Sequence, residues 1–478
     1  MSGDQKVMKK KYRLVAPDGG WGYMICVAVT ILNITSMSFM PCLGLIFNDL
    51  FIELKIGSTG FALMNGLASV AFSIAAYAAG PLFKVMNFRQ MSVLGSALNV
   101  LGCLGTYLAK SDVSFYIWQT IAGAGGGFLY NVSCTVINSY FVKKRLLSIS
   151  VTQFFPAFTG MVTPLLVKWM LEEYGCRGTL LIMAGVNLEN FVAAALIQPV
   201  EWHLVKEEVD EEEEEELLVT KPDQEKTVVI KIKDDVNPKE SSSSPEKCDD
   251  TNIKCKHKGR LRTITDMLHL NLLTNFAVIS ICLGLSFSGF CDFTFWLMLP
   301  QALIAMNMDK QTIAWTMTLY SCTDVATRVC LMVFNKLFAR IGSKNIYMIG
   351  LALAFVTRIA MLGTENVTLI ITYLSIMGTS RCIITTLMPL VLADCVEQNL
   401  FAQALGILML IFGLSNILLG PVIGAIRDMT NSYAASFYIL TSFYAIVLLF
   451  WCIEMCVLRN RKKELKQQKI LKKSNKPK

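Results

Sequence analysis

The sequence predicts an all-α integral membrane protein with twelve transmembrane helices in two six-helix halves. Its 478 residues are 54% hydrophobic, with a mean hydropathy of +0.50, and only 17% of them are charged. A soluble domain ordinarily carries about 25% charged residues. A membrane-spanning helix needs about 20 apolar residues, so the chain has room for twelve helices and short connections once its polar stretches are set aside. This composition excludes a large soluble enzyme.

Apolar segments of the required length lie on both sides of a central polar block, six on each side. They are residues 21–47, 59–84, 90–109, 114–141, 146–170, 178–199, 270–298, 308–334, 346–363, 368–394, 400–427 and 434–457. Prolines recur inside them, and a membrane helix tolerates proline where its neighbours satisfy the freed backbone groups. The equal split predicts two halves that face each other across a central cavity.

The polar stretches set the predicted domain boundaries. These are a cytoplasmic N-terminal tail (1–20), a first six-helix half (21–200), a charged cytoplasmic loop (201–266), a second six-helix half (267–457) and a basic cytoplasmic tail (458–478). The loop contains the acidic run Asp210–Glu216 and the serine run Ser241–Ser244. Such a composition cannot bury a core, which predicts disorder. The basic tail is expected to lie on anionic membrane lipid.

Lysine and arginine are divided unevenly between the two ends of the predicted helices. One set of alternate loops, together with both tails, holds most of them. The other set contains only Lys55, Lys110, Lys168, Arg177, Lys310 and Arg427, accompanied by acidic residues. Because cytoplasmic loops carry the excess of positive charge, the N-terminus, the central loop and the C-terminus are predicted to be cytoplasmic. Residues 1–18 are polar and basic, so we expect no cleavable signal peptide.

Several function classes have no support in the sequence. The net charge is +8, and the basic residues lie mainly at the ends of the predicted helices. This pattern is typical of residues that orient a membrane protein and does not indicate a nucleic-acid-binding surface. The fifteen cysteines show no disulfide or zinc spacing, and His203, His257 and His269 lie at or outside the predicted membrane edge. No nucleophile–base set and no phosphate-binding loop is present. We therefore expect no enzyme, no metal, no cofactor and no nucleic-acid partner.

A glycine-rich run, Gly123-Ala-Gly-Gly-Gly127, superficially resembles a dinucleotide-binding loop. It lies inside an apolar segment and follows no predicted strand, so the context that such a loop needs is absent. Small residues inside membrane helices allow neighbouring backbones to approach closely. The run therefore predicts close helix packing.

Charged residues inside the predicted helices require a reason, because each costs roughly 2.5–3.5 kcal/mol at the bilayer centre. Asp324 and Arg328 lie four residues apart in the eighth segment, hence on one helical face and within reach of each other. A guanidinium group binds a carboxylate through two parallel hydrogen bonds. Arg328 is thus a candidate to bind a substrate carboxylate, with Asp324 holding it until substrate or a proton intervenes. The alternative is a static ion pair that permits membrane insertion.

Arg381 lies in the middle of the tenth segment. It would give a second contact to a dianionic or amino-acid-like ligand, or it would pair with Asp292, Glu189 or Asp394 and close the bundle. Arg358, in the ninth segment, is predicted to form a structural pair. Glu189 is predicted to belong to a polar packing cluster.

The first apolar segment opens on a distinctive motif, which consists of Asp18, Gly19, Gly20, Trp21, Gly22 and Tyr23. Asp18 is suited to cap the helix N-terminus, and the tryptophan suits the membrane interface. The motif resembles the first-helix signature of the monocarboxylate transporter family, whose usual tryptophan is Tyr23 here. A second stretch, containing Tyr140, Phe141, Lys144 and Arg145, resembles the second signature of that family.

Further resemblance lies in Cys176–Ile182 and in a stretch from Pro389–Asp394 to Ser436–Tyr438. It covers nearly the whole membrane portion and leaves the central loop and the tails unmatched. The resemblance implies a major-facilitator-type fold in which two halves rock. It also implies that Asp324 and Arg328 are the substrate and proton pair and that Arg381 lies near a substrate-selecting position. A single-span glycoprotein escort is a further implication.

The chain departs from that family at the end of the first segment. The resemblance implies that proton-coupled members of the family carry a lysine beside a proline at this place. In this chain residues 39–44 are Phe-Met-Pro-Cys-Leu-Gly, which include the proline but no lysine. We therefore predict a secondary transporter that moves a monocarboxylate or related small organic solute across the plasma membrane by alternating access, with weak or absent proton coupling. The alternatives are a transport-inactive solute sensor with the same fold and a facilitative carrier of aromatic amino-acid-like solutes.

Overall fold

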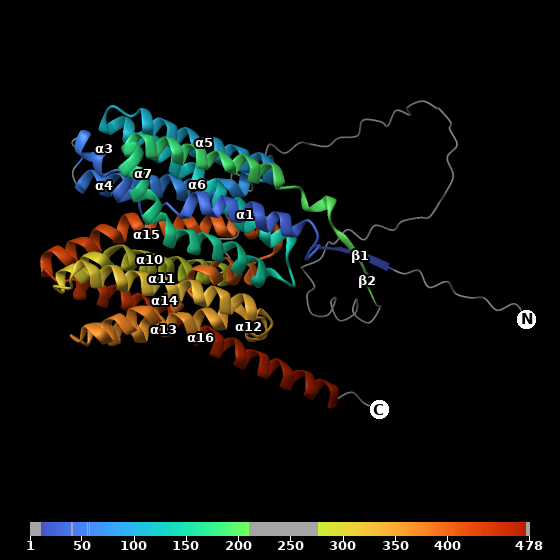
Figure 1. Cartoon of the computed structure of the whole chain (residues 1–478). Helices are drawn as coiled ribbons and strands as arrows, with labels where there is room; N and C mark the ends of the chain where they lie inside the picture. The colour runs from blue at the N-terminus through green and yellow to red at the C-terminus, as the bar shows by residue number, and fades with distance from the viewer. Residues whose placement is uncertain (1–10, 40–41, 55, 57, 210–275, 475–478) are drawn as a thin grey trace, which may run out of the picture.

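The computed structural model describes residues 11–39, 42–54, 56, 58–209 and 276–474. The N-terminal half contains α1 (Gly22–Met37), α2 (Leu43–Ile46), α3 (Asn48–Glu53), α4 (Ser58–Leu82), α5 (Phe88–Leu108), α6 (Asp112–Tyr140) and α7 (Arg145–Leu196). The C-terminal half contains α10 (Phe276–Ala305), α11 (Lys310–Val333), α12 (Asn335–Ile341), α13 (Ser343–Leu362), α14 (Val367–Cys395), α15 (Phe401–Thr430) and α16 (Tyr433–Ser474). The long helices run side by side in two groups, one for each half (Figure 1).

The described parts of all the predicted apolar segments are mainly helical, although the helices do not match the segments one to one. Among the described residues, eight helices are long and apolar enough to cross a membrane. One of these is α7, which contains two predicted segments on either side of Gly175, where φ is +65° and the helical path is broken. Glycine adopts this left-handed backbone without a steric penalty. The first predicted segment is not one helix, because α1 ends at Met37 and α2 begins at Leu43.

The structure adds a short two-stranded sheet, which the sequence analysis did not predict, to the predicted helical fold. Strand β1 (Lys11–Val15) pairs antiparallel with β2 (Val205–Val209), and Val15 faces Val205 across the pair. Strand β2 follows the short 3-10 helix Val200–Trp202. The first nine residues of the predicted disordered loop are therefore structured, and the remainder up to 266 lies outside the described residues. Nothing local marks these strands, since each pairs with a segment about 190 residues away.

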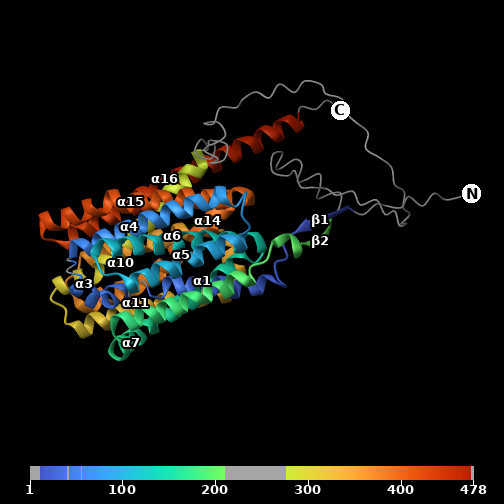
Figure 2. The same ribbon diagram turned by 90° about the horizontal axis from the view of Figure 1, so that it is seen from above.

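The C-terminal boundary also differs from the prediction. The last segment was expected to end at residue 457, whereas α16 continues through Ser474. The sequence from Tyr433 to Ser474 contains neither proline nor glycine, the two residues that most disfavour a helix interior. The β1–β2 sheet and the end of α16 project from the same end of the bundle in both views (Figure 1, Figure 2). This arrangement agrees with placing both chain ends on one side of the membrane.

The glycine-rich run of α6 packs closely on its neighbours, as predicted. A Cβ atom added to Gly123 would lie 2.4 Å from the Ala68 carbonyl oxygen, and one added to Gly127 would lie 2.1 Å from that of Phe72. Both carbonyls belong to α4. On the opposite side, a Cβ at Gly125 would meet the Asn99 nitrogen of α5 at 2.6 Å. Only glycine permits this three-helix contact.

The two halves meet along α4 and α15. A Cβ added to Gly80 would lie 2.9 Å from the Gln403 Cα, and one added to Gly406 would lie 2.8 Å from the Tyr77 Cα. These positions lie in the last turns of α4 and the first turns of α15. Close backbone contact between the halves therefore lies next to the loops that are predicted to be cytoplasmic.

In the C-terminal half, Gly378 of α14 lies directly against α11. An added Cβ would lie 2.1 Å from the Thr323 Oγ1 and 2.2 Å from the Tyr320 carbonyl oxygen. Real Cβ atoms do not approach other atoms so closely, so a larger residue would force the two helices apart.

We expect Gly378→Ala to lower the free energy of unfolding by about 1–3 kcal/mol, because overpacking displaces backbone. The measurement is the thermal unfolding midpoint of the purified protein in detergent. Gly424→Ala is the matched control, since a Cβ at Gly424 would meet nothing within 4 Å. Equal midpoints for the two variants would contradict the packing argument.

The Lys/Arg distribution predicts that epitope tags inserted at residue 240 and at the C-terminus are both accessible to antibody only after permeabilisation. The measurement is immunofluorescence on intact and on permeabilised cells. A tag placed after Asn366, in a loop predicted to be extracellular, is the control and should be reached in intact cells. Labelling of either cytoplasmic tag from outside would overturn the topology.

Candidate functional site

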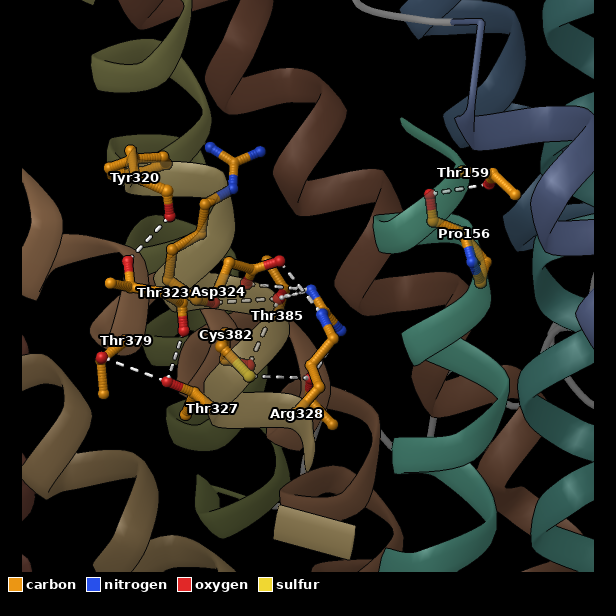
Figure 3. Close-up of polar contacts among 12 residues, drawn as sticks. Pro156, Thr159, Tyr320, Thr323, Asp324, Thr327, Arg328, Thr379, Cys382 and Thr385 are labelled. Atoms are coloured by element: carbon orange, nitrogen blue, oxygen red, sulfur yellow. Dashed lines mark hydrogen bonds and ion pairs between the residues drawn. The ribbon is translucent and has the colours of Figure 1, made fainter. Parts of the chain in front are cut away.

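Asp324 and Arg328 form a two-point ion pair within one turn of α11. The Arg328 Nε donates to the Asp324 Oδ2 at 3.1 Å, and Nη2 donates to Oδ1 at 3.2 Å. Both residues are buried, with 9% and 6% of their surfaces exposed. The four-residue spacing in the sequence thus gives the side-by-side geometry that it predicts (Figure 3).

The remaining nitrogens of Arg328 are held by α14. Nη1 donates to the Thr386 Oγ1 at 2.9 Å, and Nη2 also donates to the Thr385 Oγ1 at 3.3 Å. All three nitrogens of the guanidinium group therefore have partners. An incoming carboxylate can reach Arg328 only if one of these partners is displaced.

Threonine hydroxyls connect α11 to α14 next to this pair. The Thr323 Oγ1 donates to the Ser375 carbonyl at 2.6 Å. The Thr327 Oγ1 donates to the Thr379 Oγ1 at 3.1 Å (Figure 3). The close approach of the two helices at Gly378 brings these groups within hydrogen-bonding distance. These bonds hold α11 and α14 together next to the guanidinium group.

A second charged cluster contains Asp292 of α10, Arg358 of α13 and Arg381 of α14. Asp292 lies 3.6 Å from a nitrogen of each arginine, through Oδ1 to Arg358 and through Oδ2 to Arg381. Of the three partners that the sequence left open for Arg381, the structure brings Asp292 to it. Glu189 is exposed on α7.

The two arginines of this cluster have different surroundings. Arg358 lies between the rings of Phe295 and Tyr444, whose centroids are 4.1 and 4.5 Å from its Cζ, and its side chain is 1% exposed. Arg381 lies over the Trp296 ring at 4.6 Å, and its side chain is 21% exposed. Its Nη1 has no hydrogen-bond partner. The Arg358 Nε also lacks a partner. Arg381 is therefore the more accessible of the two cations, and each has one buried nitrogen without a hydrogen bond.

The N-terminal half faces the Asp324–Arg328 pair with uncharged groups. Pro156 and Thr159 of α7 lie across from it (Figure 3). The Thr159 Oγ1 forms a 2.7 Å hydrogen bond with the Ser38 Oγ beyond the end of α1. Sequence analysis did not identify these residues, because hydroxyl groups in a membrane helix carry little signal of their own.

The residues of the two signature motifs, at the start of α1 and at the end of α6, meet at the end of the N-terminal half where α1 begins. Asp18 was expected to cap the first helix, and this is wrong. Its Oδ1 accepts hydrogen bonds from the backbone N–H groups of Val142, Lys143 and Lys144 at 2.9, 2.9 and 3.1 Å. Asp18 has a φ of +45° and Gly20 a φ of +55°, so the chain turns away from α1 before the helix begins. The carboxylate consequently caps the start of α7.

The other motif residues complete this junction. A Cβ on Gly22 would lie 2.8 Å from the Phe141 ring, so only glycine lets α1 approach it there. Trp21 Nε1 donates to the Leu196 carbonyl at 3.2 Å, and the Tyr140 hydroxyl donates to the Gln198 carbonyl at 3.0 Å. The motifs thus tie together α1, α6 and the end of α7, away from the charged clusters.

Arg145 extends the junction to the C-terminal half. Its Nη1 lies 3.6 Å from the Asp394 Oδ1 of α14, and Asp394 also accepts a hydrogen bond from Ser343. Gln398 donates to the carbonyl oxygens of Asn138 and Ser139 at 3.4 and 3.3 Å. These polar contacts join the two halves at the end that is predicted to be cytoplasmic.

Within the described part of the chain, no group of three or more His, Cys, Asp or Glu side chains is placed to hold a metal ion. The buried carboxylates Asp292 and Asp324 form ion pairs with arginines. The arrangement is suited to reversible binding of an anion.

Comparison with solved structures confirms the fold. The E. coli fucose:proton symporter FucP superposes with a TM-score of 0.62 at 12% identity, covering 90% of this chain and 97% of that one. The proton:xylose symporter XylE gives 0.62 at 13% identity over 90% and 94% of the two chains. The human organic anion transporter MFSD10 gives 0.60 at 11% identity over 90% and 98%.

Proteins of similar sequence also match nearly the whole length of this chain. Human monocarboxylate transporter 6 is 23% identical over 90% of this chain and 79% of its own length. Human monocarboxylate transporter 14 is 23% identical over 95% and 94%. Zebrafish monocarboxylate transporter 12-B is 21% identical over 90% and 86%. The Major Facilitator Superfamily profile matches residues 24–284 and 281–478. The chain therefore belongs to the Major Facilitator Superfamily, as a multi-pass, non-enzymatic membrane carrier similar to monocarboxylate transporters.

Proposed function

We propose that this protein moves a monocarboxylate or a related small organic solute across the plasma membrane by alternating access. The observation that carries the proposal is the set of three arginines on α11, α13 and α14. Arg328 and Arg358 are buried, whereas Arg381 is partly exposed and has one nitrogen without a hydrogen-bond partner. Charged groups at membrane depth are costly and mark substrate pathways. Guanidinium groups suit carboxylate recognition because their donors match both carboxylate oxygens.

In the proposed cycle, Arg381 makes an early contact with the substrate carboxylate and Arg328 a later one. Asp324 gates the second contact, since the guanidinium group of Arg328 is already occupied by Asp324 and two threonines. In each contact a substrate carboxylate takes the place of a protein carboxylate, so the buried guanidinium group keeps a counter-ion. The hydroxyl groups of Ser38 and Thr159 supply uncharged partners on the opposite half.

The relatives named as monocarboxylate transporters support this substrate class over a transport-inactive sensor. The indole of Trp296 beneath Arg381 would also accommodate an aromatic solute, so aromatic amino-acid-like substrates belong in the same screen. A single-span glycoprotein escort is proposed as a partner, and co-expression would reveal it as increased surface delivery.

An uptake screen in a transport-poor cell tests the proposal. Lactate, pyruvate, ketone bodies, aromatic amino acids, kynurenine and creatine are offered as labelled solutes, with surface protein quantified in parallel. Saturable uptake of at least one of them is expected. Surface protein with no flux of any solute, but with ligand binding, would favour the sensor.

For an identified substrate, we expect Arg328→Lys to reduce flux by at least about tenfold. Lysine keeps the charge but loses the planar fork, and a hydrogen bond to a charged group contributes about 1.5–3 kcal/mol. Initial rates are divided by surface protein, so that a folding loss is not counted as a transport loss. The control is Arg427→Lys, which alters an arginine exposed at the end of α15. Unchanged flux in Arg328→Lys would reduce the pair to a structural role.

We expect an imposed inward proton gradient to produce no uphill accumulation of that substrate. A coupled carrier needs a titrating group inside the membrane, and α1 offers neither lysine nor histidine. Accumulation is measured with the gradient intact and after its collapse by an ionophore. If uphill accumulation appears and is lost with the ionophore, the proton belongs to Asp324. In that case Asp324→Asn should keep exchange and lose accumulation.

A further inference from the structure

Asp292 lies 3.6 Å from a nitrogen of each of two arginines, but the two contacts differ in exposure. The contact with Arg358 is enclosed, because Arg358 is covered by two aromatic rings, its side chain is 1% exposed and it also donates to the Cys291 carbonyl at 3.4 Å. The Arg381 side chain is 21% exposed. Charge-assisted N–H···O bonds are normally about 2.7–2.9 Å long, so both ion pairs are longer than a strong one. The Arg381 contact is therefore the more open of two long ion pairs.

The cluster also has an excess of positive charge. It joins two guanidinium groups to one carboxylate, whereas Asp324 and Arg328 neutralise each other. One additional carboxylate at the exposed part of the Arg381 side chain would neutralise the cluster. Arg358 would keep Asp292, so no buried cation would lose its counter-ion.

From this geometry we propose that Asp292 is an internal competitor of the substrate. In the empty carrier Asp292 shares Arg381, and the substrate carboxylate takes the Arg381 contact while Asp292 remains on Arg358. Asp292 therefore sets how tightly the carrier holds a carboxylate, although it does not itself touch the substrate. It is a specificity-determining residue outside the resemblance that identified Asp324 and Arg328. This inference rests on the proposed function, because it assigns the substrate carboxylate to Arg381.

The inference predicts that removing the competitor tightens binding. In Asp292→Asn the repulsion between the Asp292 carboxylate and a substrate carboxylate at Arg381 disappears. Interactions between charges a few ångströms apart are strong at partial burial. The dissociation constant for a carboxylate should therefore fall about tenfold or more. Release should slow accordingly, so a lower KM would accompany a lower maximal rate. A purely structural counter-ion would instead lower the amount of folded protein without tightening binding.

Binding is measured on the full-length purified protein in lipid nanodiscs, by the ligand-dependent rise of its thermal unfolding midpoint. The probes are benzoate and lactate, each compared with its uncharged amide, benzamide and lactamide. The control variant is Glu454→Gln, which neutralises a carboxylate paired with Lys344 at 3.0 Å in the same half. This variant should bind all four probes like the wild type.

Asp292→Asn leaves Arg358 without its counter-ion, which can prevent folding. The double variant Asp292→Asn/Arg358→Gln removes both charges together and leaves Arg381 free. It should show the same gain in affinity for the carboxylates and none for the amides. Arg381→Gln should lose carboxylate binding in either background.

Tighter binding of benzoate or lactate, confined to the acids, supports the inference. Folded variants that bind the acids no more tightly than the wild type overturn it, as does a gain of equal size for the amides. Absence of binding in the wild type and in both Asp292 variants also overturns it. Failure of the proposed function can be distinguished from failure of this inference. A protein that binds the acids as predicted but transports no solute in the uptake screen would contradict the proposed function. It would leave the competition at Arg381 intact.

Discussion

The C-terminal half is built around the need to bury guanidinium groups among apolar helices. A buried charge without a partner is strongly destabilising, so each arginine must find acceptors on neighbouring helices. Arg328 meets this need with Asp324 on its own helix and with threonine hydroxyls on α14. Those hydroxyls are within reach only because Gly378 lets α14 approach α11. The charge, the glycine and the threonines therefore form one interdependent arrangement.

The N-terminal half solves a different problem with different residues. Its helices pack through glycines in α6 and through short hydroxyl contacts such as that between the Thr35 Oγ1 and the Asn190 Oδ1, at 2.6 Å. It presents hydroxyl groups to the charged face of its partner. The charged face of the C-terminal half is thus opposed by neutral polar groups. In the proposed function, this division would let one half retain an anion while the other moves.

The motif junction lies away from the charged clusters and connects the halves. Asp18 fixes the turn before α7, and Arg145 in the first turn of α7 reaches Asp394 on α14. In the proposed cycle, the Asp394 contact breaks when that end of the carrier opens. The two signature motifs would then serve the movement of the halves, and solute binding would be left to residues on α10, α11 and α14.

The sequence by itself determined the helical segments, the division into two halves and the Asp324–Arg328 pair, because hydropathy and four-residue spacing are local properties. It did not determine the β1–β2 pairing, the true partner of Asp18 or the shared position of Asp292. Each of these depends on segments far apart in the chain, and the strand partners are 190 to 198 residues apart. The sequence offered three carboxylates for Arg381 with no means of choosing among them. Only the packing of α10, α13 and α14 selected Asp292, because a charge inside a membrane pairs with whichever counter-ion the tertiary structure places beside it.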